Sequence, residues 1–100
     1  MISAINTTAA AYLQSTKAAR YARLLAKLSK MEAAQIKSEI AKMHDKAHSL
    51  PKRDAWEADQ LHEMANGAAN HYFLILNPEM AYGENLEHAI KRGLPIPQAA

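Results

Sequence analysis

The sequence contains no cysteine, only three glycines and four prolines, and a single phenylalanine and tryptophan in 100 residues. Without thiols, a disulfide framework, a thiolate metal site and a cysteine nucleophile are all excluded. Few glycines and prolines favour long, uninterrupted elements, because these two residues are the usual breaks in regular structure. No apolar run approaches the roughly 18 residues that a transmembrane helix needs.

The residues that are present are those of helical proteins. Apolar residues make up 49% of the chain, much of it alanine, and leucine, lysine and glutamate are the other strong helix formers. A chain of this length is expected to form one domain, here residues 1–100. We therefore predict an all-α fold, a small bundle of three main antiparallel helices followed by a short C-terminal helix and an extended tail.

The charges are separated along the chain, although the formal net charge is only +2. Residues 1–31 carry five basic side chains and no acid, and residues 54–90 carry seven acids and no lysine or arginine. Such an asymmetry predicts two surfaces of opposite sign, or attraction between two parts of the structure. The N-terminus lacks the pattern of a secretory signal and resembles an organellar presequence only in being acid-free, amphipathic and rich in Ser, Thr and Arg.

The first helix is expected to begin near residues 6–8 and to end at Leu28, because Asn6, Thr7 and Thr8 are good N-caps. Its basic side chains Arg20, Arg23 and Lys27 fall together on the flank of an apolar sector. The members of that sector are Leu13, Tyr21, Leu24, Leu25 and Leu28.

The second helix has the sequence of a capping box at its start, Ser29 followed three residues later by Glu32. It is expected to end before Pro51, which disfavours helical geometry in the preceding residue. Its apolar residues follow a 3-4-3-4-3 spacing, which predicts one buried face of a helical bundle. These residues are Ala33, Ile36, Ile40, Met43, Ala47 and Leu50.

The third helix is expected to start at Pro51 or Asp54 and to continue to Leu76. The pair Asn66-Gly67 often marks a turn, but the apolar spacing persists across it, so we predict one continuous helix. The end of this segment, residues 72–76, is apolar on all sides, which leaves a short β-strand as the competing interpretation.

After the third helix, Asn77-Pro78 is expected to open a short helical turn. A final helix is predicted from Glu84 to Arg92, with Leu86 and Ile90 facing inward and Gly93 as the C-cap. The prolines of residues 94–97 exclude a further helix there.

The histidines are the only candidates for metal chemistry. His44 and His48 are four residues apart, so both imidazoles lie on one face of the second helix. The pairs Asp59/His62 and Glu84/His88 have a similar spacing, but no Glu-x-x-His motif of a di-metal bundle is present. No glycine-rich phosphate loop and no serine on a nucleophile elbow is found. We therefore expect no metal, no cofactor and no enzymatic activity.

The remaining signals favour a protein–protein interaction module. Trp56, Phe73 and Leu74 lie off the apolar row of the third helix, and exposed apolar groups beside charge are typical of interfaces. We expect these three as apolar contacts and Arg20, Arg23 and Lys27 as basic contacts. These features are compatible with a small regulator or inhibitor that docks on a larger assembly. We expect the protein to be bacterial or viral and to act in the cytoplasm. A second copy of the chain, in a homodimer, is one candidate partner.

The alternative function is that of an accessory protein that binds nucleic acid through the basic flank of the first helix. The join of the first two helices could form a helix-turn-helix, although Ser29 would fill an apolar turn position. Membrane-surface binding is not expected, because the apolar face of the first helix has no Trp or Phe and its leucines are needed for a core.

Overall fold

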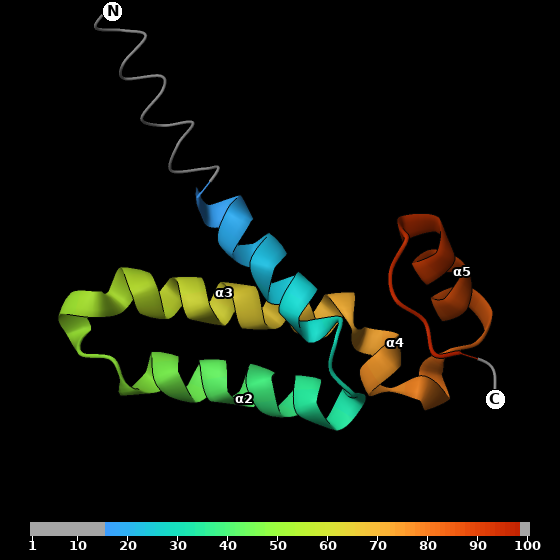
Figure 1. The fold of residues 1–100 in the computed structure, drawn as a ribbon, viewed down its shortest axis with the longest axis horizontal. Helices are drawn as coiled ribbons and strands as arrows, with labels where there is room; N and C mark the ends of the chain where they lie inside the picture. The colour runs from blue at the N-terminus through green and yellow to red at the C-terminus, as the bar shows by residue number, and fades with distance from the viewer. Residues whose placement is uncertain (1–15, 99–100) are drawn as a thin grey trace, which may run out of the picture. The chain divides into compact units, whose positions relative to one another are not determined.

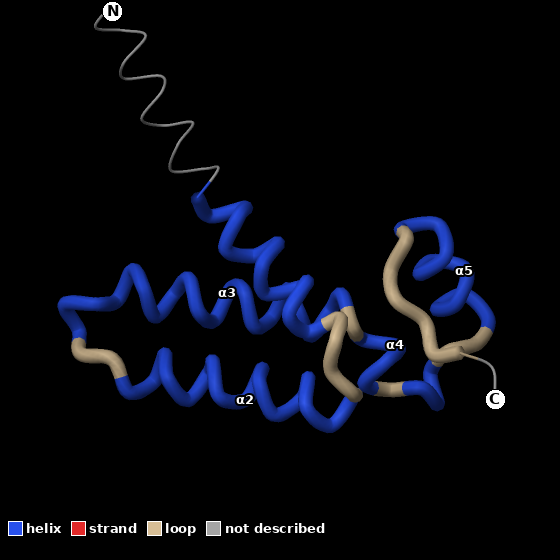
Figure 2. Tube along the Cα trace, viewed as in Figure 1, coloured by secondary structure: helices blue, strands red, loops and turns tan. Residues whose placement is uncertain are grey.

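The computed structural model describes residues 16–98, and within them 81% of the residues are helical and none forms a strand. The protein is therefore all-α, as predicted (Figure 2). The chain divides into two compact units, Met1–Lys30 and Met31–Ala100, and each is described by itself. The prediction of one domain over residues 1–100 stays a prediction.

In the first unit, residues 16–28 are helical, so the expected end at Leu28 is confirmed. Two bonds from Ser29 finish this helix: its backbone N–H donates to the Leu25 carbonyl at 2.9 Å, and its hydroxyl donates to the Ala26 carbonyl at 2.6 Å. The expected start at residues 6–8 and the apolar Leu13 lie outside the described residues.

Helix α2 spans Ala33–Ser49, and the predicted capping box at Ser29 is wrong. Glu32 is the N-cap and forms the capping box with Gln35, whose Oε1 accepts a hydrogen bond from the Glu32 N–H at 3.0 Å. The box is displaced by three residues because the N–H groups of Ser29 and Lys30 still bond to carbonyls of the preceding helix, at Leu25 and Lys27, so the next helix cannot start there. The helix ends before Pro51, as expected.

A 3₁₀ turn, η1 (Lys52–Asp54), leads into helix α3 (Ala55–His71), so the predicted continuity through Asn66-Gly67 is confirmed. The predicted extension to Leu76 is wrong, because Tyr72 leaves helical geometry (φ −97°, ψ 18°) and a separate short helix, α4 (Phe73–Leu76), follows. The N–H of Tyr72 still donates to the Ala68 carbonyl at 2.9 Å, which closes the last turn of α3. The competing β-strand at residues 72–76 is also wrong.

Helices α2 and α3 lie side by side and antiparallel, since only residues 50–54 connect them (Figure 1). The buried apolar residues of α2 are isoleucine and alanine, and those of α3 are mostly alanine, so the two helices can pack closely. The buried apolar residues are Ile36, Ile40 and Ala47 of α2 and Leu61, Ala65 and Ala68 of α3. The polar Gln60 of α3 is also buried.

The last elements are the 3₁₀ turn η2 (Pro78–Met80), with Asn77 as N-cap as predicted, and helix α5 (Gly83–Arg92). Gly93 ends α5 in the left-handed region (φ +66°), where glycine has no steric penalty. The prediction that Ile90 faces inward is wrong. Ile90 is exposed, and its neighbour Ala89 is the buried residue of α5. Residues 94–98 are not helical, as expected.

Candidate functional site

Large apolar side chains are exposed mainly in the last quarter of the chain. Among the described residues, six such side chains are exposed, and only Trp56 lies outside residues 73–96. The other five are here called the C-terminal apolar residues: Phe73, Met80, Tyr82, Ile90 and Ile96. Single exposed apolar residues are ordinary, but these five are concentrated in one part of the sequence, which makes them the candidates for an interaction surface.

Helix α5 and its N-cap Tyr82 supply the two most exposed of these residues. Positions 82, 86, 89 and 90 have the spacing of one helix side. The middle of this side is covered, with Leu86 half-buried and Ala89 buried, whereas Tyr82 and Ile90 at its two ends are 67% and 62% exposed. The opposite side is polar and consists of Glu84, Glu87, His88 and Lys91.

The three predicted apolar contacts have different environments. Trp56 in the first turn of α3 is 67% exposed and Phe73 at the start of α4 is 41% exposed, whereas Leu74 is buried at 4%. Leu74 therefore contributes to the packing of α4 rather than to its surface. Sequence reasoning missed the two exposed residues at α5: Ile90 was expected to face inward, and Tyr82 was not considered because it precedes the predicted helix.

The three predicted basic contacts share one side of the helix at residues 16–28, since their spacing of three and four residues keeps them together. Arg23 and Lys27 are exposed and Arg20 is half-buried. Beside them, burial raises the pKa of Tyr21 above its ordinary value of 10.0, so this phenol is neutral at physiological pH. A contact role for these residues stays a prediction.

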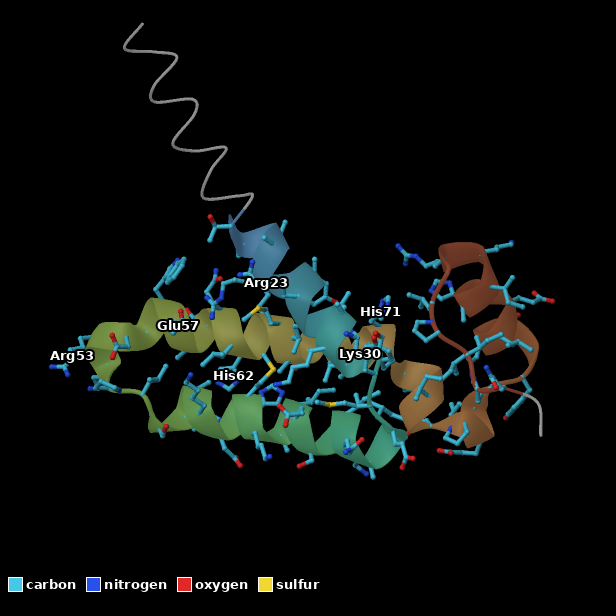
Figure 3. The ribbon with its side chains drawn as sticks, viewed as in Figure 1. Arg23, Lys30, Arg53, Glu57, His62 and His71 are labelled. Carbon is cyan, nitrogen blue, oxygen red and sulfur yellow. The ribbon has the colours of Figure 1, made fainter. Side chains whose placement is uncertain are left out.

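A cluster of three imidazoles lies between α2 and α3. His44 Nδ1 and His62 Nδ1 are 2.7 Å apart, and the two rings are tilted by 32° with centroids 5.0 Å apart. The His48 ring meets His62 edge-on, at 66° and 4.8 Å. Figure 3 shows His62 reaching from α3 toward α2. The sequence spacing paired His44 with His48 on one helix. The residue that contacts His44 is His62 on the neighbouring helix, 18 residues away along the chain, and spacing within one helix cannot identify it.

The histidine cluster is hydrogen-bonded rather than arranged as a metal site. Within residues 16–98, no group of three or more His, Cys, Asp or Glu side chains is placed so that it could hold a metal ion. A separation of 2.7 Å is that of a short hydrogen bond. The cluster therefore consists of a hydrogen-bonded pair, His44 and His62, and a third ring, His48, that packs against His62.

Of the helices in the described part of the chain, none is long and apolar enough to cross a membrane. No protein-family model, no curated protein and no solved structure shows a significant match to the chain.

Proposed function

We propose that the protein is a non-enzymatic protein–protein interaction module that docks through its C-terminal apolar residues. The observation that carries the proposal is the exposure of two large apolar side chains at α5: Ile90, at the edge of the apolar side of the helix, and Tyr82, the extended residue that caps its start. An amphipathic helix ordinarily buries its apolar side against another element. A partner surface would supply that missing contact.

Burial of these side chains would contribute to the free energy of binding. Full burial of one large apolar side chain contributes about 1.5–3 kcal/mol. Tyrosine is enriched among the few residues that dominate interface energetics, because it combines a large apolar ring with a polar tip. Tyr82 and Ile90 are accordingly the expected centre of the contact, with Phe73 as a further apolar contact. Trp56 lies at the opposite end of α3 from α4, so it would form a separate apolar contact.

The proposed role is that of a small regulator or inhibitor that docks on a larger assembly. The chain is small, and its separated charges provide a basis for selecting partners: residues 1–31 carry no acid and residues 54–90 no lysine or arginine. We include a bacterial or viral cytoplasmic setting in the proposal, with which the absence of cysteine is compatible. A second copy of the chain is one candidate partner.

The test compares two double variants of the α5 region in quantitative affinity capture from cells of the source organism. Tyr82→Ser with Ile90→Ser removes both exposed apolar side chains. Glu84→Ser with Lys91→Ser is the matched control, because it changes two exposed residues on the opposite side of α5. Recovery of a specific partner is expected to fall at least tenfold, roughly 1.4 kcal/mol, with the first variant only.

Sedimentation velocity on the wild type and the same variants, over a wide concentration range, identifies the kind of partner. A concentration-dependent dimer that Tyr82→Ser/Ile90→Ser abolishes would make the second copy the partner. Equal recovery of every captured protein by the two variants, together with equal sedimentation, would contradict the proposal.

A second candidate function, binding of nucleic acid, is favoured by the stripe of Arg20, Arg23 and Lys27. These residues share one helix side in a segment without acids. Such a stripe can neutralise several phosphates, and binding would then weaken steeply with salt through counterion release. For three phosphates the affinity is expected to fall roughly 40-fold between about 50 and 200 mM salt.

Fluorescence anisotropy with labelled DNA and RNA measures this salt dependence. The variant Arg20→Glu/Arg23→Glu/Lys27→Glu is expected to lose binding. The control Lys37→Glu/Lys42→Glu/Lys46→Glu makes the same change in net charge at three exposed lysines of α2, and it is expected to keep most of the affinity. No binding by the wild type at low salt would eliminate this function.

A further inference from the structure

The contact between His44 and His62 restricts how many protons the two rings can hold. A neutral imidazole has one N–H donor and one bare acceptor nitrogen, and an imidazolium has two donors. With the two Nδ1 atoms 2.7 Å apart, one of them donates and the other accepts. The observed contact is therefore compatible with no more than one proton on the two Nδ1 atoms together.

The first added proton can enter without breaking this contact. If the donor ring is protonated at its Nε2, it becomes an imidazolium that still donates from Nδ1 to its neutral partner, and such charge-assisted bonds are stronger than neutral ones. A second proton must occupy the accepting Nδ1. Two N–H groups would then point at each other, so the rings must separate.

The carboxylates near the pair lie at the surface, where water and salt screen their attraction for a positive charge. The acids nearest in sequence are Asp45, beside His44 in α2, and Asp59 and Glu63, three residues before and one residue after His62 in α3, and all three are exposed. His48 adds a third imidazole, 4.8 Å from His62 between ring centroids. The turn η1, which packs on α3, carries Lys52, Arg53 and Asp54, and α4, which packs on α2, has no ionisable side chain.

We propose that the His44–His62 pair is an acid-sensitive latch between α2 and α3. The latch is closed when the two rings share one Nδ1 proton, and it opens when both rings are charged. Histidine is the side chain whose charge changes most readily near physiological pH, so acidification is the signal to which the pair would respond. Both rings are half-buried beside the α2–α3 core, so opening loosens the packing near the buried Ile40 and Leu61.

The sign of the effect follows from proton counting. The closed pair accepts the first proton through a charge-assisted bond but cannot accept the second, whereas the unfolded chain accepts both. At a pH low enough for the second proton to bind, the unfolded state therefore holds more protons than the closed pair, and stability falls on further acidification.

Urea unfolding at pH 7.5 and 5.0 tests the latch. The unfolding constant of the wild type is expected to rise at least tenfold more on acidification than that of His62→Asn, whose amide lies near the position of Nδ1 but takes up no proton. His88→Asn changes an exposed histidine of α5 and is expected to behave as the wild type. Equal pH responses of wild type and His62→Asn would overturn the proposal.

Nuclear magnetic resonance of the wild-type protein gives a second test that needs no variant. Long-range ¹H–¹⁵N spectra at pH 7.5 identify the protonated nitrogen of each ring. The expected result is one ring of the His44–His62 pair with a protonated Nδ1 and the other with a bare Nδ1. Bare Nδ1 atoms on both rings would exclude the hydrogen bond and with it the latch.

Discussion

Replacing Ile36 by alanine is expected to lower the free energy of unfolding by about 3 kcal/mol, within the roughly 2–5 kcal/mol range for buried Ile→Ala changes. Ile36 is 1% exposed and lies in the first turn of α2. Its removal takes apolar surface out of the core and leaves a cavity that neighbouring side chains fill only in part. In a domain of this size the melting temperature should fall by roughly 12–24 °C. Urea unfolding followed by circular dichroism measures the change.

The control for this prediction is the same substitution at Ile90. Ile90 also lies in a helix but is 62% exposed, so Ile90→Ala is expected to change the free energy of unfolding by no more than about 0.5 kcal/mol. Dilute protein should be used, because Ile90 belongs to the proposed docking surface. Equal losses for the two variants would contradict the assignment of Ile36 to the core and Ile90 to the surface.

Replacing Asn66 by proline is expected to destabilise the protein by about 3 kcal/mol or more and to reduce its helix content. Asn66 is exposed in the interior of α3, twelve residues into a helix that runs from Ala55 to His71. Proline there removes one backbone donor and clashes with the carbonyl four residues earlier. Far-ultraviolet circular dichroism and urea unfolding report both effects.

The matched variant Asn66→Ala keeps the backbone N–H and raises helix propensity, so its stability should equal or exceed that of the wild type by up to about 0.7 kcal/mol. The comparison tests whether Asn66-Gly67 is helical, as the structure has it, or a turn, as such pairs often are. If Asn66→Pro were as stable as Asn66→Ala, the continuous α3 would be excluded.

The sequence predicted most of the helices and several of their ends from local chemistry. Pro51 stops α2, Asn77-Pro78 opens η2 and Gly93 ends α5, because proline and glycine act through their own backbone geometry. The continuity of α3 was also predictable, since an apolar row that persists across Asn66-Gly67 requires a single helix.

The helix starts and ends that were missed depend on competition between neighbouring groups. Ser29 and Glu32 both suit a capping box, but the Ser29 N–H still bonds to Leu25 of the preceding helix, so Glu32 and Gln35 form the box instead. The predicted third helix is interrupted at Tyr72, where the sequence has no proline or glycine that would predict an interruption. Tyr72 and Leu74 are both buried while Phe73 between them is exposed, an arrangement that an uninterrupted apolar run does not reveal.

The sequence by itself determined the all-α class, the order of the helices and the separation of charge, because propensity, caps and apolar spacing act over a few residues. Only the tertiary structure decided which apolar residues stay exposed and which histidines meet. Ile90 is exposed and Ala89 is buried although the two are neighbours on the apolar side of α5. His62 contacts His44 only because α2 and α3 fold back on each other. Exposure and contact are properties of what packs against a helix, and that partner can lie any distance away along the chain.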